Sequence, residues 1–272
     1  MRRSSWSSLP RVSAKPASWP ISPDPAFAIG PNPEKDDKLK ERLTQLAHEK
    51  PRYGYRRLAI LLRREGQIVN HKRWFRVYRM AGLSVRRKKR KHLMRVGQPC
   101  FTATRQNQQW AIDFVHDRMA NGRTLRVLSI VDTFTRECLG LEVDTCLPSR
   151  RVTRALDRVI AARGKPERIR MDNGSELTSR HFLSWGIDQR IELVHIQPGK
   201  PVQNAHVESF HGRFRDECLN TQWFRNLWHA RRRITAWRNE FNQERPHSSL
   251  DYRTPNEFAQ ACLAATALAV AQ

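Results

Sequence analysis

The sequence lacks any run of about 18 apolar residues, the length that would cross a bilayer as a helix. The Ala-rich stretch at 261–271 is too short for that purpose. The amino terminus carries Arg2 and Arg3 but continues into Ser, Pro and Trp, where a secretory signal has an apolar core. We therefore expect a cytoplasmic protein that has no membrane partner.

Paired cysteines are also missing. The chain has 5 cysteines, an odd number, and none of them form a C-x-x-C pair. His206 and His211 have the spacing of zinc-finger histidines, but no close cysteine pair completes such a site. Neither a disulfide framework nor a zinc site is therefore expected, and the cysteines are predicted to be reduced thiols.

Acidic residues are scarce. There are 26 of them against 50 Lys and Arg, which gives a formal charge of +24. A protein this basic attracts polyanions, so nucleic acid is the first candidate partner. With 272 residues and 39% hydrophobic content, the chain is long enough for one large domain and a small one.

The two ends of the chain show little patterning. Residues 1–36 are rich in Ser, Pro and Arg and have no sustained period, so they are predicted to be disordered or a linker. The Ala-rich tail at 261–272 is expected to be peripheral.

Between these ends, residues 37–92 have the pattern of a small all-α module. Leucines recur at helical spacing after Lys38 and again over 56–65, where Gly66 ends the pattern. Asn70 suits the N-cap of a third helix that runs to Gly82. The order helix, short turn, helix predicts a helix-turn-helix.

The last of these helices is basic, and a basic run follows it at once. We expect these side chains to contact DNA, with the helix in the major groove. The alternative is a solvated basic surface with an import-like run. The DNA-contact candidates in this part are Arg73, Arg76, Arg86, Arg87, Lys88, Lys89, Arg90 and Lys91.

After residue 104 the apolar period changes to two, which is typical of strands. Over 110–115 this alternation puts Asp113 on a partly buried face. Asn121-Gly122 predicts a hairpin turn into a strand at 125–131, and a third antiparallel strand is expected at 137–143.

Helices and strands then alternate, as in an α/β fold. Gly164 ends the first helix, and Asp172 directly follows the next strand. The predicted elements are a helix at 149–163, a strand at 168–171, a helix at 179–186, a strand at 191–195 and a helix at 203–219.

Three acids stand out by their placement: Asp113 on a strand, Asp172 at a strand end and Glu208 on a helix beside an apolar stripe. Carboxylates brought together in this way repel each other unless cations neutralise them. Oxygen ligands suit Mg²⁺, and two such ions support in-line phosphoryl displacement. Taken singly, the acids could instead be a hydrogen-bonded strand acid, a turn acid and a surface acid that pairs with Arg215.

Longer motifs carry a family resemblance. They are WAIDFV at 110–115, DNGSE at 172–176, the run at 196–220 that contains HVESFHGRFRDECLN, and RPHSSL at 245–250. RYGYRRL at 52–58 and VNHKR at 69–73 extend the likeness upstream, so it covers about residues 36–260. The chain resembles the second-reading-frame DDE transposases of the insertion-sequence-three family, which are close to the retroviral integrase core. Thirty-five residues separate Asp172 from Glu208, which matches the D-D-35-E pattern of that family.

The resemblance implies roles for the site residues. Asp113 and Asp172 would each hold metal, with Asp113 bridging two Mg²⁺ ions, and Glu208 would complete the second site; Mn²⁺ would substitute. Further DNA-contact candidates near the active site are Lys200, Gln203, Asn204 and Arg215. For Arg215, a salt bridge to Glu208 or Glu217 is an equally open interpretation.

The resemblance also implies the fold and the partners. We expect an α/β, RNase H-like mixed five-stranded sheet flanked by helices over 101–260, with strand order 3-2-1-4-5, preceded by the helix-turn-helix module at 37–92. The partners would be the transposon terminal repeats, target DNA and further copies of the chain in a synaptic complex. A first-reading-frame protein would be a fusion partner.

The predicted reaction is Mg²⁺-dependent cleavage at the 3′ ends of the element, followed by strand transfer to a second DNA. One rival is a non-catalytic DNA-binding regulator or domesticated remnant, against which the intact triad argues. A ribonuclease H is the other rival, but the helix-turn-helix and RPHSSL have no place in that enzyme.

Overall fold

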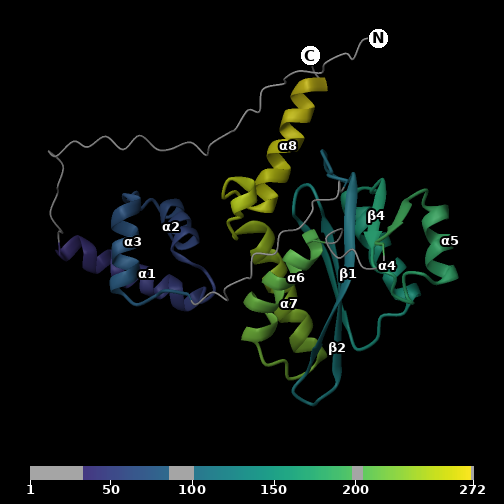
Figure 1. Ribbon diagram of the computed structural model, residues 1–272, viewed down its shortest axis with the longest axis horizontal. Helices are drawn as coiled ribbons and strands as arrows, with labels where there is room; N and C mark the ends of the chain where they lie inside the picture. The colour runs from purple at the N-terminus through teal and green to yellow at the C-terminus, as the bar shows by residue number, and fades with distance from the viewer. Residues whose placement is uncertain (1–32, 86–100, 198–204, 271–272) are drawn as a thin grey trace, which may run out of the picture.

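The structure, a computed structural model, describes residues 33–85, 101–197 and 205–270. Figure 1 shows a small group of helices, α1 to α3, beside a larger part in which helices cover both faces of a β-sheet. The small helical part comes first in the chain, as predicted.

The small part is held together by an apolar core. Helix α1 spans Pro33–Glu49, α2 Tyr55–Arg64 and α3 His71–Met80. Asn70 caps α3 as predicted, because its side chain accepts a hydrogen bond of 2.9 Å from the backbone N–H of Lys72. The core side chains are Leu39, Leu43, Leu46, Tyr53, Leu58, Leu62, Trp74, Val77 and Tyr78. The helical spacing of the leucines therefore folds into the expected helix, turn, helix arrangement.

The larger part is built on a five-stranded sheet in the order β3-β2-β1-β4-β5, which confirms the predicted order. Strands β1, β2 and β3 are antiparallel, joined first by a hairpin at which Gly122 has a φ of +79°. Strands β4 and β5 run parallel to β1. The bounds are β1 Gln109–Arg118, β2 Thr124–Asp132, β3 Cys138–Asp144, β4 Arg168–Met171 and β5 Glu192–His195.

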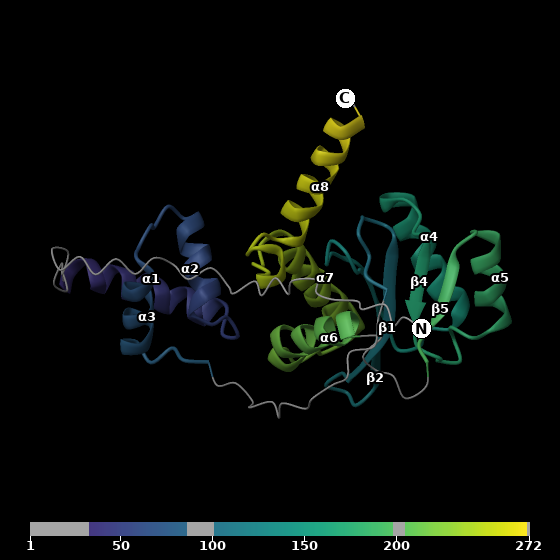
Figure 2. The same ribbon diagram turned by 45° about the horizontal axis from the view of Figure 1, so that its top comes forward.

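Helices cover the sheet on both faces, so alternate residues of β1 enter different cores (Figure 2). On one face Ile112 packs with helices α4, Ser149–Arg163, and α5, Arg180–Asp188. On the other face Val115 packs with helices α6, Ala205–Glu217, and α7, Leu227–Gln243. The strand is buried on both sides, which explains why apolar residues occupy both of its faces at 110–115.

The carboxyl-terminal region adds elements that the sequence analysis did not describe. Short 3-10 turns occur at Leu219–Thr221 and Ser248–Leu250, and helix α8 spans Pro255–Val270. The expected boundary between the catalytic domain and an Ala-rich tail, at residue 260, lies inside α8, so the chain stays helical across it. Among the described residues, none of the helices combines the length and apolarity needed to cross a membrane.

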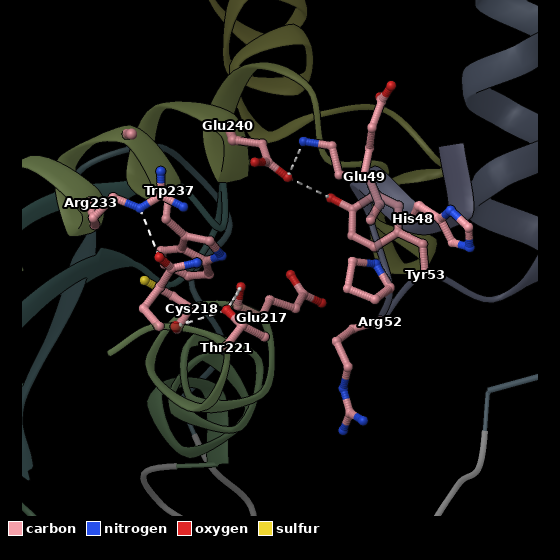
Figure 3. A pocket seen from close by; sticks show the side chains of 14 residues that line it. His48, Glu49, Arg52, Tyr53, Glu217, Cys218, Thr221, Arg233, Trp237 and Glu240 are labelled. Carbon is pink, nitrogen blue, oxygen red and sulfur yellow. Dashed lines mark hydrogen bonds and ion pairs between the residues drawn. The ribbon is translucent and has the colours of Figure 1, made fainter. Parts of the chain in front are cut away.

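The small helical part contacts helices α6 and α7 through charged side chains. The Nζ of Lys50 lies 2.7 Å from a carboxylate oxygen of Glu240, and Arg57 lies 3.6 Å from Glu217. A cavity of about 370 Å³ lies at this junction, between the loop after α1 and the helices α6 and α7 (Figure 3). The two parts therefore meet on the helix that also carries Glu208.

Candidate active site

The backbone brings the three predicted acids toward the end of β4, beside the middle of β1. Asp113 lies in the middle of β1, and Asp172 directly follows β4. These strands are parallel neighbours with Ala111 opposite Arg170, so the same register carried forward sets Asp113 level with Asp172. Glu208 lies in the first turn of α6, which packs against β1.

The carboxylate of Asp113 is the most perturbed of these groups. Burial raises its pKa to about 6 against an ordinary 3.8, although a hydrogen bond of 2.7 Å from the backbone N–H of Phe114 works in the opposite direction. The charges of Asp172 and Glu208 raise that pKa further. The three acids are thus close enough to repel one another.

A tight turn orients Asp172. Its Oδ1 accepts a hydrogen bond of 3.3 Å from the backbone N–H of Gly174, and the amide of Asn173 donates to the carbonyl oxygen of Ile196 at 3.1 Å. A Cβ atom on Gly174 would lie 3.2 Å from the Asp172 carboxylate. A side chain there would press on the acid, which explains the glycine in DNGSE.

Glu208 is exposed, but the helix that carries it is firmly anchored. Phe210 and Phe214 are buried and stack with ring centroids 6.2 Å apart, and both pack against Trp237 of α7. The apolar stripe that the sequence predicts along this helix is therefore real. It places Glu208 at the border between the core and solvent.

A histidine and a serine lie behind Asp113. Ser129 is paired opposite Asp113 in the sheet, and its hydroxyl donates to the Asp113 carbonyl oxygen at 3.0 Å. The Nε2 atom of His211 lies 2.7 Å from that hydroxyl, and its Nδ1 lies 3.6 Å from Oδ2 of Asp113. In the sequence, His211 stands out by its zinc-finger-like spacing from His206, and nothing singles out Ser129.

The donor set suits a hard cation. Asp113, Asp172 and Glu208 offer oxygen atoms only, and the charges of Asp172 and Glu208 add to the burial that raises the pKa of Asp113. Within the described ranges, however, no group of three or more His, Cys, Asp or Glu side chains is closed tightly enough to enclose a metal ion. The acids share a neighbourhood and fit a cation chemically, without forming a complete ligand cage.

The predicted DNA-contact residues have different outcomes. Arg73 and Arg76 lie on α3, but both bind the carboxylate of Asp36 on α1, at 2.7 and 2.6 Å. Arg215 donates to the carbonyl oxygen of His116 at 3.3 Å, which is neither of the two salt bridges considered for it. The candidates Arg86, Arg87, Lys88, Lys89, Arg90, Lys91, Lys200, Gln203 and Asn204 lie outside the described residues.

The RPHSSL motif supplies an arginine whose role the sequence analysis did not assign. Arg245 is buried and binds Glu217 of α6 through two hydrogen bonds of 2.7 and 2.6 Å. Its guanidinium lies 5.8 Å from the ring centre of Tyr53, in the small helical part. Arg245 thus ties the carboxyl-terminal motif to both α6 and the helical part.

The cavity at the junction is a separate feature. Glu217, Cys218 and Trp237 line it from one side, and Tyr53 lines it from the other (Figure 3). Asp113, Asp172 and Glu208 are not among the residues that line it. The candidate active site is therefore separate from this cavity.

Comparisons with protein families agree with this division of the chain. Residues 34–91 match the HTH-like domain family. Residues 103–201 and 189–255 match two families that are both described as the integrase core domain. Together these matches cover the helical part, the sheet that carries Asp113 and Asp172, and the helix that carries Glu208.

Individual proteins from insertion sequences are also similar to this chain. The chain is 48% identical over 226 residues to the insertion element IS407 uncharacterized 31.7 kDa protein of Burkholderia multivorans, which covers 83% of this chain and 82% of that protein. It is 28% identical over 238 residues to the transposase for insertion sequence element IS904 of Lactococcus lactis, covering 81% of this chain and 92% of the relative.

A solved structure supports the fold. A chain in the cryo-EM structure of the simian T-cell lymphotropic virus intasome in complex with PP2A regulatory subunit B56 gamma superimposes with a TM-score of 0.51. The match covers 80% of this chain and 74% of that one, at 17% sequence identity. At that identity the likeness concerns the fold alone.

Proposed function

The chain belongs to the DDE transposases of the insertion-sequence-three family, and on that premise we propose that Asp113, Asp172 and Glu208 form its catalytic site for DNA cleavage and strand transfer. The protein is an insertion-sequence transposase, a polynucleotidyl transferase with an integrase core. The observation that carries the residue assignment is the buried carboxylate of Asp113, whose pKa is raised to about 6 by burial and by the two other acids.

Asp113, Asp172 and Glu208 would hold two Mg²⁺ ions, for which Mn²⁺ would substitute. Bound there, the ions would supply the positive charge that activates the attacking oxygen and stabilises the leaving oxygen. The fixed position of Asp113 on a central strand and the turn at Gly174 keep two of the carboxylates aligned before DNA arrives. Glu208 is exposed and faces the solvent side from which a DNA strand would approach.

The reaction would have two displacements at phosphorus. In the first, the oxygen of a water molecule bonds to the phosphorus at an element end, and the bond to the 3′ oxygen breaks to leave a 3′-hydroxyl. In the second, that hydroxyl oxygen bonds to a target phosphorus, the bond between this phosphorus and its 3′ oxygen breaks, and the cut target strand is left with a 3′-hydroxyl. Neither step forms a covalent bond to the protein.

The partners follow from the same premise. We propose that the helical module at 37–92 and the catalytic domain at 101–260 bind the terminal repeats and target DNA. The net charge of +24 supports this proposal. We also propose that copies of the chain assemble into a synaptic complex. A first-reading-frame fusion partner stays a prediction.

The test uses a labelled duplex that carries the end of the encoding element. Its joining to a second DNA is measured in the presence of Mg²⁺. Asp113→Asn, Asp172→Asn and Glu208→Gln should each lower joining by about a thousandfold or more while DNA binding stays near native, because each removes a charge that acts only in the reaction. Asp117→Asn on the same strand and Asp216→Asn on the same helix are matched controls that should join DNA normally.

Triad variants that join DNA as well as the native chain would refute this assignment. A native chain that binds the duplex but neither cuts nor joins it would favour the non-catalytic regulator instead. Cleavage of an RNA–DNA hybrid without any joining of DNA would favour the ribonuclease H alternative.

A further inference from the structure

Two tryptophans stand out by their exposure at the corner where helix α7 begins. Trp223 is 77% exposed and Trp228 is 67% exposed, whereas the other four tryptophans that the structure describes are buried. Those four are Trp74, Trp110, Trp185 and Trp237. Large aromatic side chains are concentrated at contact surfaces, because one part of the ring is apolar and another part can stay wet. The start of α7 is therefore a candidate for binding a partner.

The backbone between the two tryptophans is held in place. Phe224 is buried in the core with α6 and α7, and its carbonyl oxygen accepts a hydrogen bond of 2.8 Å from the backbone N–H of Ala120 in the β1–β2 hairpin. The side chain of Asn226 caps α7, since it accepts a hydrogen bond of 2.8 Å from the backbone N–H of His229. The fold thus presents both tryptophan rings on a fixed frame.

The surroundings of the two rings are basic. From 218 to 239 the chain contains five arginines and no acidic residue. On α7, Trp228, Arg231 and Arg232 are exposed and share one face of the helix. The guanidinium of Arg232 lies 5.6 Å from the centre of the Trp228 ring. Arg231 binds Asp144 at 2.6 Å, so the cations that we assign to this surface are Arg232 and the exposed Arg225. We call Trp223, Arg225, Trp228 and Arg232 the aromatic corner.

The aromatic corner lies within reach of a DNA that occupies the proposed active site. Glu208 and Arg215 are seven residues apart on α6, so they share one face of that helix. At a rise of 1.5 Å per residue, α6 carries the chain about 14 Å from Glu208 to its last residue, Glu217. The corner follows after one short turn, so its distance from Glu208 is on the order of 20 Å, the rise of about six nucleotides in a duplex.

The combination of flat rings and cations fits a nucleic-acid strand with unpaired bases. Bases stack on exposed indole rings, while arginines bind the phosphates between them. A closed duplex offers its phosphates but hides the faces of its bases, so the rings would stay in water. A second copy docked about a twofold axis would set this basic segment against itself, and the like charges would repel.

We propose that the aromatic corner binds a DNA strand with unpaired bases beside the cut element end. The inference rests on the proposed function, because each displacement there breaks one strand of a duplex and lets the bases next to the break separate. It adds a binding surface that lies outside the triad and outside the DNA-contact residues expected from the sequence.

The test measures binding of the full chain to a labelled oligothymidylate of about 20 nucleotides and to a duplex of the same length. Trp223→Ala and Trp228→Ala should each weaken binding of the oligothymidylate by about fivefold or more, because each removes a ring on which a base stacks. Binding of the duplex should stay near native. Trp228→Phe keeps an aromatic ring and should bind the oligothymidylate more tightly than Trp228→Ala. Both rings are exposed, so these variants should also keep the native melting temperature.

The arginines have a separate readout, the dependence of the binding constant on salt. Arg225→Gln and Arg232→Gln should each reduce the slope of log K against log salt by about 0.7, the contribution of one phosphate contact to a single strand. Ile187→Ala and Arg154→Gln are matched controls, an exposed apolar side chain on α5 and an exposed arginine on α4, over the opposite face of the sheet. Both should bind like the native chain.

Native affinity for the oligothymidylate in both alanine variants would overturn the proposal, and so would a native chain that does not bind it. An equal loss of affinity for the duplex would overturn the stacking role. A monomer–dimer equilibrium that shifts in the alanine variants, with oligothymidylate binding unchanged, would identify a second copy as the occupant instead. The test uses no joining reaction, so its failure leaves the triad assignment standing, which the joining assay decides separately.

Discussion

Helix α6 carries one glutamate at each end, and the two have opposite surroundings. Glu208, in the first turn, is exposed and adds its negative charge to that of Asp113 and Asp172. Glu217, at the last residue, is 9% exposed and receives two hydrogen bonds from the buried Arg245. One end of the helix gathers like charges, whereas the other end pairs unlike charges.

This difference separates the part of the molecule that is built for chemistry from the part that holds the fold together. The buried carboxylate of Glu217 is compensated by its arginine partners. A group of carboxylates that raises the pKa of its buried member, Asp113, is a cost to the fold, and such groups concentrate at functional sites. Helix α6 links the acidic site to the anchoring pair, because the bonds at Glu217 fix the helix that carries Glu208.

The largest effect on stability should come from Arg245→Met. It leaves Glu217 buried without its partner, so the free energy of unfolding should fall by about 3–5 kcal/mol, measured by urea denaturation. Adding Glu217→Leu should recover a large part of the loss, since an apolar pair carries no buried charge. If the single variant were as stable as the native chain, Arg245 would not anchor α6.

Asp113→Asn should have the opposite effect. It should raise the free energy of unfolding when EDTA removes metal. The folded pKa of Asp113, about 6, lies above its ordinary value of 3.8. The stability that this group contributes is therefore present below pH 3.8 and is lost as the pH rises through 6. At pH 8 the variant should be more stable by about 3 kcal/mol.

Urea denaturation between pH 4 and pH 8 checks that prediction, with Asp117→Asn as the matched control on the same strand. An Asp113→Asn variant that is less stable than the native chain at pH 8 would mean that the acid is satisfied in the fold.

His247, which follows Arg245 in the RPHSSL motif, should have a smaller and pH-dependent effect on the free energy of unfolding. Burial and the neighbouring Arg245 lower its pKa from 6.5 to about 3, so the folded protein resists a proton that the unfolded chain accepts. This contribution is present above pH 6.5 and is lost as the pH falls toward 3. At pH 5 the loss should be about 2 kcal/mol.

The measurement is the slope of stability against pH between 6.5 and 4, which should be shallower in His247→Gln than in the native chain. His71→Gln, an exposed residue of α3, is the control and should keep the native slope. Equal slopes in all three proteins would show that His247 titrates normally.

The smallest effect should come from Arg64→Gln. Arg64 pairs with Glu257 at 2.8 Å, with side chains that are 35% and 45% exposed. Exposed pairs of this kind contribute less than about 1 kcal/mol, because water and salt screen them. A loss as large as that of Arg245→Met would show that the contact between the helical part and α8 matters more than its exposure indicates.

Much of the fold was predictable because it depends on local patterns. Helix 149–163 and strand 168–171 have the expected bounds, since Gly164 and the apolar spacing mark them. Helix α7 was missed, although the spacing of four apolar residues and the cap at Asn226 mark it clearly. Those buried residues are Ala230, Ile234, Trp237 and Phe241.

The contacts within the site were harder to predict because they join residues that are distant in the sequence. Nothing local to Glu217 indicates Arg245, 28 residues away, or assigns Asp36 as the partner of Arg73, 37 residues away. The three acids were found as a set only through longer motifs. The position of His211 behind Asp113 depends on the pairing of two strands with a helix, which residue spacing does not reveal.

The most direct test makes the same chemical change at both ends of α6 and measures Mg²⁺-dependent joining of element-end DNA, below the melting temperature of each variant. Glu208→Gln should fold with near-native stability and join no DNA, whereas Glu217→Gln should be less stable but join DNA while folded. If Glu208→Gln joined DNA at the native rate, the assignment of the catalytic triad would be wrong.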